Sequence, residues 1–426
     1  MKVLVIGSGG REHALIWKIA RSKLVSKLYC ANGNGGIGNL AECVPIKPDD
    51  IEGLRNFALE QSIDLTVVGP EQPLTMGIVD EFESKGLKIF GPSAMAAEIE
   101  GSKVFSKYLM QKYDIPTADF KVFTEVHDAK EYLREKNKPC VVKADGLAAG
   151  KGAVVCRKLA EALDAVEFMM SDHAFGSAGD RVVIEEFMEG EEASVFVITD
   201  GTDFLVLPVA QDHKRALDGD RGKNTGGMGA YAPAPVMTPD LLQAAIASIV
   251  KPTIAAMAKE GRSYKGVLYC GLMVTSDGPK VVEYNCRFGD PECQVVMPLI
   301  ESDVVEMFIA ACDGRIKDYS LTLSDRHATC VVLASGGYPE AYEKNKVIHG
   351  LDLAGGDGIM IFHAGTQRKD DQFLTNGGRV LGVTAVGADL GEAVEKAYGA
   401  VAKIRFDKAH YRKDIGSKAL KKVPGK

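Results

Sequence analysis

The sequence predicts a protein of several domains in the α/β and α+β classes. Over about the first hundred residues, short apolar runs that end in glycine alternate with amphipathic helical segments, which is typical of βαβ units on a parallel sheet. Over about the last hundred residues, strands with a period of two predominate and one helix closes the chain. The length of 426 residues is enough for about two to four domains with hydrophobic cores.

The N-terminal part is predicted to be a Rossmann-like domain. Its first strand covers residues 3–6 and ends in the turn GSGG at 7–10, where a helix follows. Further strands are expected at residues 28–31, 65–68 and 88–90. Ligands bind parallel sheets at the carboxyl ends of the strands, where these glycine-rich turns fall. A boundary is expected near Gly91-Pro92, before a helix capped by Ser102.

The rest of the chain has a different texture. The strands expected in it are residues 140–143, 154–156, 182–187, 329–333, 359–364 and 380–386. The polar, glycine-rich segment 212–235 has no pattern of regular structure, and such a long loop is usually functional or disordered. TNGG at 375–378 predicts a hairpin turn, and a closing helix is expected at 390–403.

Composition is that of a soluble globular protein, and the cytoplasm is the expected location. The 51 Lys and Arg residues against 58 Asp and Glu give a net charge of −7, which argues against nucleic acid or acidic membranes as partners. Nine scattered cysteines without a C-x-x-C pair suggest neither a disulfide framework nor a zinc site. The N-terminus is broken too early by glycine for a signal peptide, and no uninterrupted apolar stretch of about 18 residues occurs.

Two lysines surround a glycine-rich turn at residues 141–152, VVKADGLAAGKG. A strand would deliver Lys143, and a flexible turn would present Lys151 between Gly150 and Gly152. Glycine lets backbone N–H groups approach phosphate oxygens, and lysine adds a positive charge. The turn is no Walker loop, since neither Ser nor Thr follows Lys151. We interpret it as a candidate phosphate-binding loop; the alternative is an ordinary hairpin with solvated lysines.

Polar residues alternate along a predicted strand at residues 280–292, KVVEYNCRFGDPE. Glu283, Asn285 and Arg287 would share one face, while the intervening residues would point into a core. A carboxylate and an amide oxygen two residues apart suit a hard cation such as Mg²⁺, completed by water and phosphates. Arg287 suits a carboxylate or a transferring phosphoryl group. The alternative is a half-exposed strand whose polar face meets water.

Two weaker segments add to these. In VIEEFMEGEE at residues 183–192, acidic groups suit ribose hydroxyls and the Phe187–Met188 backbone suits an adenine edge, although an acidic surface turn has the same pattern. GSGGREH at residues 7–13 is close to the dinucleotide fingerprint G-x-G-x-x-G, but Glu12 replaces its third glycine. Arg11 near a helix N-terminus favours a phosphorylated sugar over NAD.

Taken in order, these segments resemble the ATP-grasp superfamily and, within it, the glycinamide ribonucleotide synthetase family. The matching stretches span the chain: GSGGREHA (7–14), VVGPEQPL (67–74), KIFGPS (88–93), EGSKVFSK (100–107), VVKADGLAAGKG (141–152), VIEEFMEGEEAS (183–194), QDHKR (211–215), NTGGMGAYAPAP (224–235), EYNCRFGDPE (283–292) and TNGGRVLGVTA (375–385). The resemblance implies a parallel-sheet domain (1–101), a two-lobed ATP-grasp domain (102–325) with a smaller lobe acting as a lid (about 117–190), and a mixed α/β domain (326–426).

The resemblance also implies an ATP-dependent carbon–nitrogen ligase of purine biosynthesis. ATP would phosphorylate glycine, and 5-phosphoribosylamine would attack the glycyl phosphate, giving glycinamide ribonucleotide, ADP and phosphate. Mg²⁺ or Mn²⁺ would be the metal. The implied partners are these small molecules, without nucleic acid or membrane, and we expect a monomer.

The resemblance assigns roles to matching residues. It assigns nucleotide binding to Lys103, Lys143, Gly150, Lys151, Gly152, Glu185, Phe187, Met188 and Glu192, and the metal to Glu283 and Asn285. It assigns catalysis to Lys143, Lys214, Arg287 and Asp290. It assigns substrate binding to Gly9, Gly10, Arg11, Glu12, Glu71, Asp212, Thr225, Gly226, Gly227 and Arg287.

Two stretches depart from the family pattern. CANGN at residues 30–34 lacks the usual proline before Gly-Asn, and YCGLM at 269–273 lacks the extra acidic metal ligand of many ATP-grasp enzymes. The metal would then rely on Glu283, Asn285, phosphates and water.

Three other functions stay open. One is a different ATP-grasp ligase or carboxylase, although no biotin-carrying Ala-Met-Lys-Met segment occurs. The second is a nicotinamide oxidoreductase, and the third is an ATP-binding scaffold without catalysis. Glycine-dependent release of phosphate and a titration with NAD would separate them.

Overall fold

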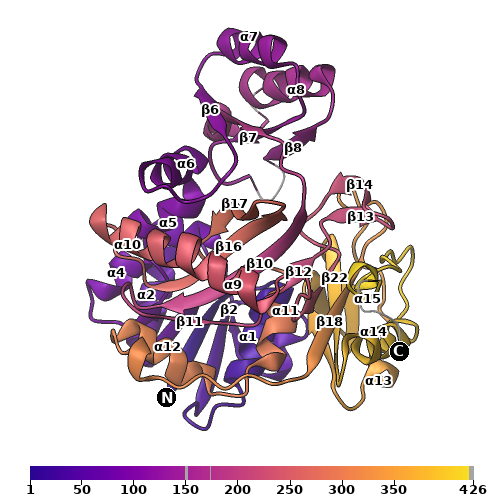
Figure 1. Cartoon of the computed structure of the whole chain (residues 1–426). Coiled ribbons are helices and arrows are strands. Elements are labelled where there is room, and N and C mark those ends of the chain that lie inside the picture. The colour runs from indigo at the N-terminus through magenta and orange to yellow at the C-terminus, as the bar shows by residue number, and fades with distance from the viewer. Residues whose placement is uncertain (149–151, 173, 422–426) are drawn as a thin grey trace.

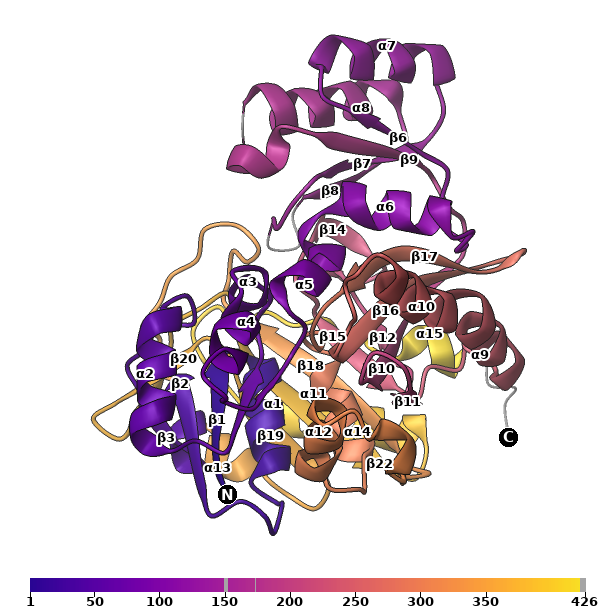
Figure 2. The ribbon, with the colours of Figure 1, turned by 90° about the vertical axis from the view of Figure 1, so that its left-hand side faces the viewer.

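The computed structural model describes residues 1–148, 152–172 and 174–421. Four sheets of four or five strands and two two-stranded ribbons make up the β-structure of these residues. In Figure 1 a small lobe stands above a broad base, and the base carries the N-terminal sheet on one side and the C-terminal sheet on the other. Figure 2 shows the same separation after a quarter turn. The fold is mixed α/β, as predicted.

The N-terminal sheet is parallel, with the order β3-β2-β1-β4-β5. Its strands are β1 (Lys2–Gly7), β2 (Lys27–Asn32), β3 (Glu42–Val44), β4 (Leu65–Val68) and β5 (Ile89–Phe90). Its helices are α1 (Gly10–Ile19), η1 (Ile37–Asn39), α2 (Ile51–Gln61), α3 (Glu71–Thr75), α4 (Ile78–Glu83) and α5 (Ala94–Gly101). Because β2 and β4 flank β1, the turns after β1 and β4 meet at the point where the strand order reverses, which is where such sheets bind ligands.

The small lobe has an antiparallel sheet and a core of its own. Its strands, in the order β6-β9-β7-β8, are β6 (Phe120–Phe123), β9 (Val182–Glu186), β7 (Cys140–Ala144) and β8 (Ala153–Cys156). Its helices are α7 (Val126–Lys136), α8 (Leu159–Val166), η2 (Glu167–Ser171) and η3 (Gly176–Gly179). The apolar cluster inside contains only residues of this lobe, from Phe123 to Ile184. Helix α6 (Lys103–Lys112) leads into the lobe, and Ser102 caps it by accepting from the Phe105 N–H at 3.0 Å, as predicted.

The central sheet is antiparallel and carries the polar strand predicted near residue 283. Its order is β11-β10-β16-β17, with bounds Phe204–Val206, Glu191–Thr199, Gly266–Thr275 and Gly278–Asn285. One side is covered by the helical run α9 (Pro239–Ala245), η4 (Ile246–Val250) and α10 (Lys251–Lys259). This run is the one described helix long and apolar enough to cross a bilayer, a weak indication by itself. Here Ile249, Val250 and Met257 pack in the same core cluster as Leu268 of β16.

The C-terminal sheet includes two strands from the middle of the chain. Its order is β12-β15-β18-β22-β19, with bounds Gln211–Asp212, Gly229–Ala232, His327–Ala334, Arg379–Gly387 and Ile359–His363. The remaining helices are α11 (Cys293–Val296), η5 (Met297–Leu299), α12 (Val304–Cys312), η6 (Ile316–Asp318), α13 (Leu351–Ala354), α14 (Leu390–Val401) and α15 (Ser417–Leu420). Helix α14, predicted at 390–403, packs on β18 and β22.

Two sequence predictions are wrong. The segment 212–235 contains regular structure: β15 pairs with β18, and β13 (Arg215–Leu217) pairs with β14 (Arg221–Asn224). These strands are only three or four residues long, so their partners, and not their own pattern, determine them. The TNGG sequence at 375–378 does not close a hairpin, because β21 (Gln372–Thr375) pairs with β20 (Thr366–Lys369) while β22 pairs with β18 and β19. The hairpin turns instead at Asp370 and Asp371, both with positive φ.

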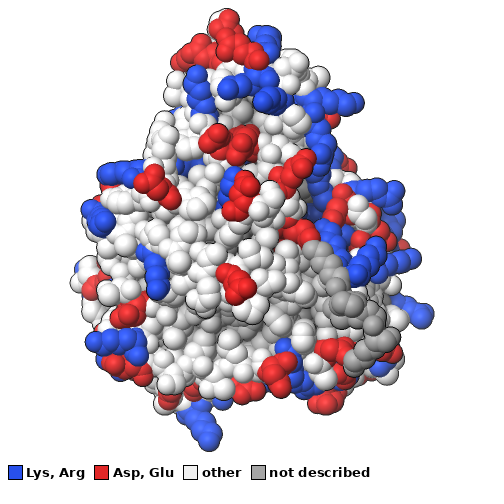
Figure 3. Space-filling view, viewed as in Figure 1, with Lys and Arg blue, Asp and Glu red and all other residues white. Residues whose placement is uncertain are grey.

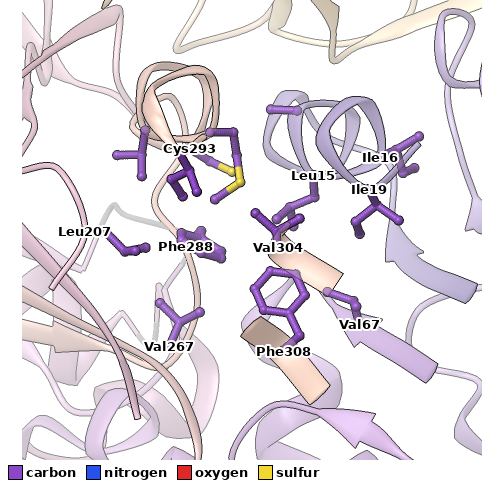
Figure 4. Close-up of a cluster of buried hydrophobic side chains, with 14 of the residues drawn as sticks. Leu15, Ile16, Ile19, Val67, Leu207, Val267, Phe288, Cys293, Val304 and Phe308 are labelled. Atoms are coloured by element: carbon purple, nitrogen blue, oxygen red, sulfur yellow. The ribbon is translucent and has the colours of Figure 1, made fainter. Parts of the chain in front are cut away.

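A single hydrophobic cluster joins the three parts of the base. It contains Leu15 of α1, Val267 of β16, Phe308 of α12 and Cys330 of β18. Figure 4 shows side chains of α1 and α12 meeting those near β16 and Phe288 in this cluster. All nine cysteines are free, and most of them are buried, as expected from their apolar surroundings. The base is therefore one packed body, whereas the small lobe is packed separately.

The surface charge is uneven. Figure 3 shows Lys, Arg, Asp and Glu crowding the small lobe and the flank of the ribbon β13–β14, while the face over α9 and α10 is largely uncharged.

Candidate functional site

Two lysines from different elements meet β17 below the small lobe. Lys143 lies on β7, and its Nζ donates to the carbonyl of Val282 at 2.8 Å. Lys103 begins α6, and its Nζ donates to the carbonyl of Gly146 at 3.1 Å. Burial and Lys143 lower the pKa of Lys103, although Glu283 opposes this. The strand, the helix and the turn after β7 thus concentrate positive charge at one place.

A buried carboxylate balances this charge. Glu185 Oε1 on β9 lies 2.9 Å from Lys143 Nζ, and its Oε2 lies 3.2 Å from Lys107 Nζ. Lys107 also donates to Thr117 Oγ1 at 2.7 Å, and burial lowers the pKa of Lys107 to about 8. The sequence interpretation missed Lys107. Its position four residues after Lys103 on one helix, which puts both on the same face, was the available signal.

The candidate metal ligands lie at the end of β17. Asn285 is buried and Glu283 is half-buried, while Tyr284 and Cys286 point into the core, as the alternation predicted. Burial alone would raise the pKa of Glu283, but Lys214, Lys143, Lys103 and Arg287 lower it. Glu283 is therefore an anion surrounded by cations.

This donor set fits a hard cation that also binds phosphates. Within residues 1–148, 152–172 and 174–421, no group of three His, Cys, Asp or Glu side chains could hold a metal by itself. Mg²⁺ commonly binds one or two protein oxygens and completes its shell with water and substrate phosphates. One carboxylate and one amide oxygen beside lysines suited to phosphates match that requirement.

A third group joins β10 to β12. Lys214 forms an ion pair with Glu192, the residue expected to hold a ribose. Burial lowers the pKa of Lys214, but Glu192 and Asp212 outweigh this effect and hold it well above its usual value. Burial raises the pKa of Asp212 despite the opposing effect of Lys214. These charges lie near Glu283, so the 212–214 segment belongs to the same site.

Arg287 links the central sheet to the N-terminal domain. Its Nη2 donates to Glu100 at 2.8 Å and its Nε donates to Glu71 at 3.1 Å. Glu71 also lies 4.0 Å from Arg11. Burial would raise the pKa of Glu71, but Arg287 and Arg11 outweigh this effect and lower it to about 2. Glu100, which the sequence interpretation missed, accepts from the Cys286 N–H at 2.7 Å as well. Arg287 is thus fixed by two acids.

The GSGG turn is held by Glu12. Its Oε2 accepts from the Gly9 N–H at 2.6 Å and its Oε1 accepts from Arg11 Nε at 2.6 Å. A Cβ at Gly9 would lie 2.7 Å from Glu12 and 3.2 Å from Asp290, and one at Gly10 would approach Gln294, so a larger residue at either position would displace these side chains. Glu12 therefore shapes the turn, and both of its oxygens are already engaged.

A second glycine-rich turn completes the site. Thr225 Oγ1 donates to the Lys214 carbonyl at 2.8 Å and accepts from the Gly227 N–H at 3.0 Å. Arg379 Nη1 donates to the carbonyls of Gly226 at 2.7 Å and Asp290 at 2.6 Å. Arg379, another residue that the sequence interpretation missed, thereby binds this turn to the loop after β17.

The remaining predicted residues belong to the small lobe, and two of them lie outside the described residues. Phe187 and Met188 follow β9, and the Arg157 guanidinium lies 4.8 Å from the centre of the Phe187 ring. Gly152 is buried before β8. Gly150 and Lys151 lie outside the described residues.

Comparison with known proteins identifies the family. Family profiles described as the N domain, the ATP-grasp (A) domain and the C domain of phosphoribosylglycinamide synthetase match residues 1–100, 101–293 and 328–418. The chain belongs to the phosphoribosylglycinamide synthetase family. Among the relatives of this family member are the phosphoribosylamine–glycine ligases of Brucella melitensis and Escherichia coli K12. Both are 52% identical to it, over 423 and 426 residues, and each match covers 99% of both chains.

The fold of this family member also matches a solved relative. The crystal structure of phosphoribosylamine–glycine ligase from Thermotoga maritima is 34% identical, with a TM-score of 0.83, and the match covers 97% of this chain and 100% of that one. The resemblance inferred from the motifs is thereby confirmed.

Proposed function

We propose that this chain is an ATP-dependent ligase that joins glycine to 5-phosphoribosylamine through a glycyl phosphate, giving glycinamide ribonucleotide, ADP and phosphate in purine biosynthesis. Family membership over the whole chain supports the overall reaction. The observation that carries the site assignment is the convergence of Lys103, Lys143 and Glu283 between the small lobe and β17.

The nucleotide would bind between the small lobe and the central sheet. Lys103 and Lys143 would bind its phosphates, and the glycine-rich segment 146–152 would cover them. Glu185, Phe187 and Met188 would contact the adenine edge, and Glu192 would accept from the ribose hydroxyls. The separate core of the small lobe supports its action as a lid, because the lobe can tilt without disturbing the packing of the base.

Glu283 and Asn285 would hold Mg²⁺ or Mn²⁺. When bound, the metal ion neutralises phosphate charge.

The first step would activate glycine. A carboxylate oxygen of glycine attacks the γ-phosphorus of ATP, the bond to the β–γ bridging oxygen breaks, and ADP leaves. The protein's contribution is to position the two anions against each other and to neutralise their charge, which is the usual basis of phosphoryl transfer. Arg287, held by Glu71 and Glu100, presents a fixed guanidinium for this purpose. Asp212 is suited to the ammonium group of glycine.

The second step would form the amide bond. The amine of 5-phosphoribosylamine attacks the glycyl carbonyl carbon, phosphate leaves with the oxygen that came from glycine, and the nitrogen loses a proton. The turn at Gly9, Gly10 and Arg11, at the N-terminus of α1, suits the sugar phosphate. Asp290, whose Oδ2 would lie 3.2 Å from a Cβ built on Gly9, would accept a hydrogen bond from the amine. Thr225, Gly226 and Gly227 would enclose the reacting groups, and Lys214 would stabilise the leaving phosphate.

We also propose that the enzyme acts as a monomer in the cytoplasm, without nucleic acid or membrane as a partner. A net charge of −7 supports the absence of a nucleic-acid partner.

The test uses glycine labelled with ¹⁸O in its carboxylate. Turnover with ATP, Mg²⁺ and 5-phosphoribosylamine is expected to transfer one labelled oxygen to inorganic phosphate. The amine displaces phosphate from the glycyl carbon, and the departing phosphate keeps the glycine oxygen that joined the two. Ligation with unlabelled phosphate would overturn the intermediate but leave the overall reaction intact. Absence of glycine-dependent ADP release would overturn the function itself.

Controls separate the alternatives. Alanine and bicarbonate in place of glycine test another ATP-grasp substrate, and calorimetry with NAD tests an oxidoreductase. Glu283→Ala, with an unchanged circular dichroism spectrum, is expected to stop ADP release.

A further inference from the structure

Among the described residues outside the site, Arg412 has the most deeply buried charged side chain. Its side chain has no exposed surface, and it is one of the largest fully buried side chains of the described chain. Nε and Nη2 donate to the two oxygens of Asp414, both at 2.8 Å. Nη1 donates to Asp220 Oδ1 at 2.9 Å and to the carbonyl of Arg215 at 3.1 Å. The guanidinium therefore joins the C-terminal segment to the start of β13 and to the turn between β13 and β14.

The C-terminal segment makes further contacts with the same ribbon. His410 Nε2 lies 2.8 Å from the carbonyl of Ala216, and the Lys413 N–H donates to Asp218 at 2.8 Å. Asp414 Oδ2 accepts from the Gly219 N–H at 2.8 Å, and Lys418 forms an ion pair with Asp220. Residues 410–418, here called the C-terminal clamp, thus contact β13 and the turn that follows it. Figure 1 shows the ribbon beside the C-terminal sheet, near α15.

The ribbon is continuous with the proposed substrate site. At its base, the Lys214 carbonyl accepts from the Thr225 N–H and from Thr225 Oγ1, both at 2.8 Å. Side chains alternate here: Lys214 reaches Glu192 in the site, while His213 is buried on the other side and accepts from the Gly416 N–H at 3.2 Å. The clamp therefore contacts the backbone and the back of the segment whose front carries Asp212 and Lys214.

We propose that Arg412 is a positioning residue: through the β13–β14 ribbon, the C-terminal clamp holds Asp212, Lys214 and Thr225 in place for glycine, without touching a substrate. This inference rests on the proposed function. It differs from a general structural role, because Lys103, Lys143 and Glu185 lie on α6, β7 and β9, which the clamp does not contact in any hydrogen bond or ion pair described for it. Binding of the adenine and the phosphates, which is assigned to these three residues, should therefore not depend on Arg412; of the proposed nucleotide contacts, the ribose contact of Glu192 is the one that involves Lys214.

The test compares Arg412→Met with the wild-type enzyme. We expect kcat/KM for glycine to fall about 30-fold or more, while the Kd for ATP changes less than about twofold. Trypsin is expected to cleave after Arg221 and Lys223, at the far strand of the ribbon, at least about ten times faster. Arg412→Lys keeps the charge but not the paired geometry with Asp414, so it is expected to restore part of the activity. Arg315→Met is the matched control, because Arg315 forms an exposed ion pair with Asp313 elsewhere on the base.

The outcomes for Arg412→Met and Arg412→Lys either support or overturn the positioning role. Unchanged glycine kinetics and unchanged cleavage in Arg412→Met would overturn the inference, as would a parallel loss of ATP binding. If Arg412→Met does not fold, the same measurements on Arg412→Lys decide, with a smaller loss expected for glycine and none for ATP. A wild-type enzyme without glycine-dependent turnover would overturn the proposed function, whereas the cleavage rates would still test the clamp.

Discussion

Two buried histidines between the N-terminal and C-terminal domains should make the stability of this protein depend on pH. His13 Nδ1 accepts from the His363 N–H at 2.8 Å, and the His13 ring packs edge-on against Phe362 at 5.7 Å. Burial, with a smaller effect of His363, lowers the pKa of His13 to about 3, and burial lowers that of His363 to about 4. Both rings are therefore neutral in the folded protein, and a proton on His13 Nδ1 would remove its hydrogen bond.

The sign and the size follow from these values. An unfolded histidine has a pKa of about 6.5, so between that pH and the folded values only the unfolded chain binds the protons. The contribution of each ring is complete above about pH 6.5 and is lost as the pH falls toward about 4 for His363 and about 3 for His13. From pH 7.5 to 5.5 each ring should lower the free energy of unfolding by about 1.4 kcal/mol, and the pair by about 2.7 kcal/mol.

The single tryptophan is a suitable reporter. Trp17 lies on α1, and its ring centre is 5.9 Å from that of Phe362, at the same interface. Urea unfolding followed by its fluorescence would compare wild type with His13→Gln, whose amide oxygen can replace the acceptor. The difference in free energy of unfolding between them should shrink by about 1.4 kcal/mol from pH 7.5 to 5.5. His127→Gln is the control, since that ring is 76% exposed. Parallel curves for wild type and His13→Gln would refute the reasoning.

Four shorter predictions concern the site. Lys143→Ala should lower ADP release by about 100-fold or more at unchanged circular dichroism, since it removes a charge beside the proposed phosphates; near-normal turnover would exclude that role. Lys107→Met removes one of the two ion pairs of Glu185, so that Lys143 alone balances this carboxylate. The KM for ATP should rise about tenfold with less effect on kcat, and an unaltered KM would contradict this. Gly227→Ala places a Cβ against Pro291 at a φ of +115°, so we expect a lower Tm and a lower kcat/KM for glycine. Gly399→Ala is the control, because a Cβ at Gly399 would meet open space. EDTA should stop ADP release, and Mg²⁺ or Mn²⁺ should restore it; activity that persists in EDTA would argue against the metal.

Local patterns predicted the elements that carry most of the site. Alternation along β17 correctly oriented Glu283 and Tyr284, and the capping serine correctly located the start of α6. Such signals work because a strand's period and a helix cap are decided by neighbouring residues. The family motifs then indicated which of these side chains belong together.

Contacts between distant segments were not predictable in this way. Glu100 is bound to Arg287, and Arg412 to Asp220, across more than a hundred residues in each case, and neither pair leaves a local pattern. The strand β15 was missed for the same reason, because β18, which pairs with it over all four residues, lies far along the chain. The TNGG segment had the composition of a turn, but the sheet partners of β22 prevented it from closing one.

The origin of β12 and β15 has a consequence for how the protein is made. A ribosome releases residues 211–232 long before β18, so a nascent chain that already holds the proposed nucleotide lysines has β12 but lacks β18, the other partner of β15. Until synthesis passes residue 334, the edge of β15 that later pairs with β18 is open, the kind of surface that associates with other chains. The pairing of β15 with β18 is thus delayed until the C-terminal domain is being translated.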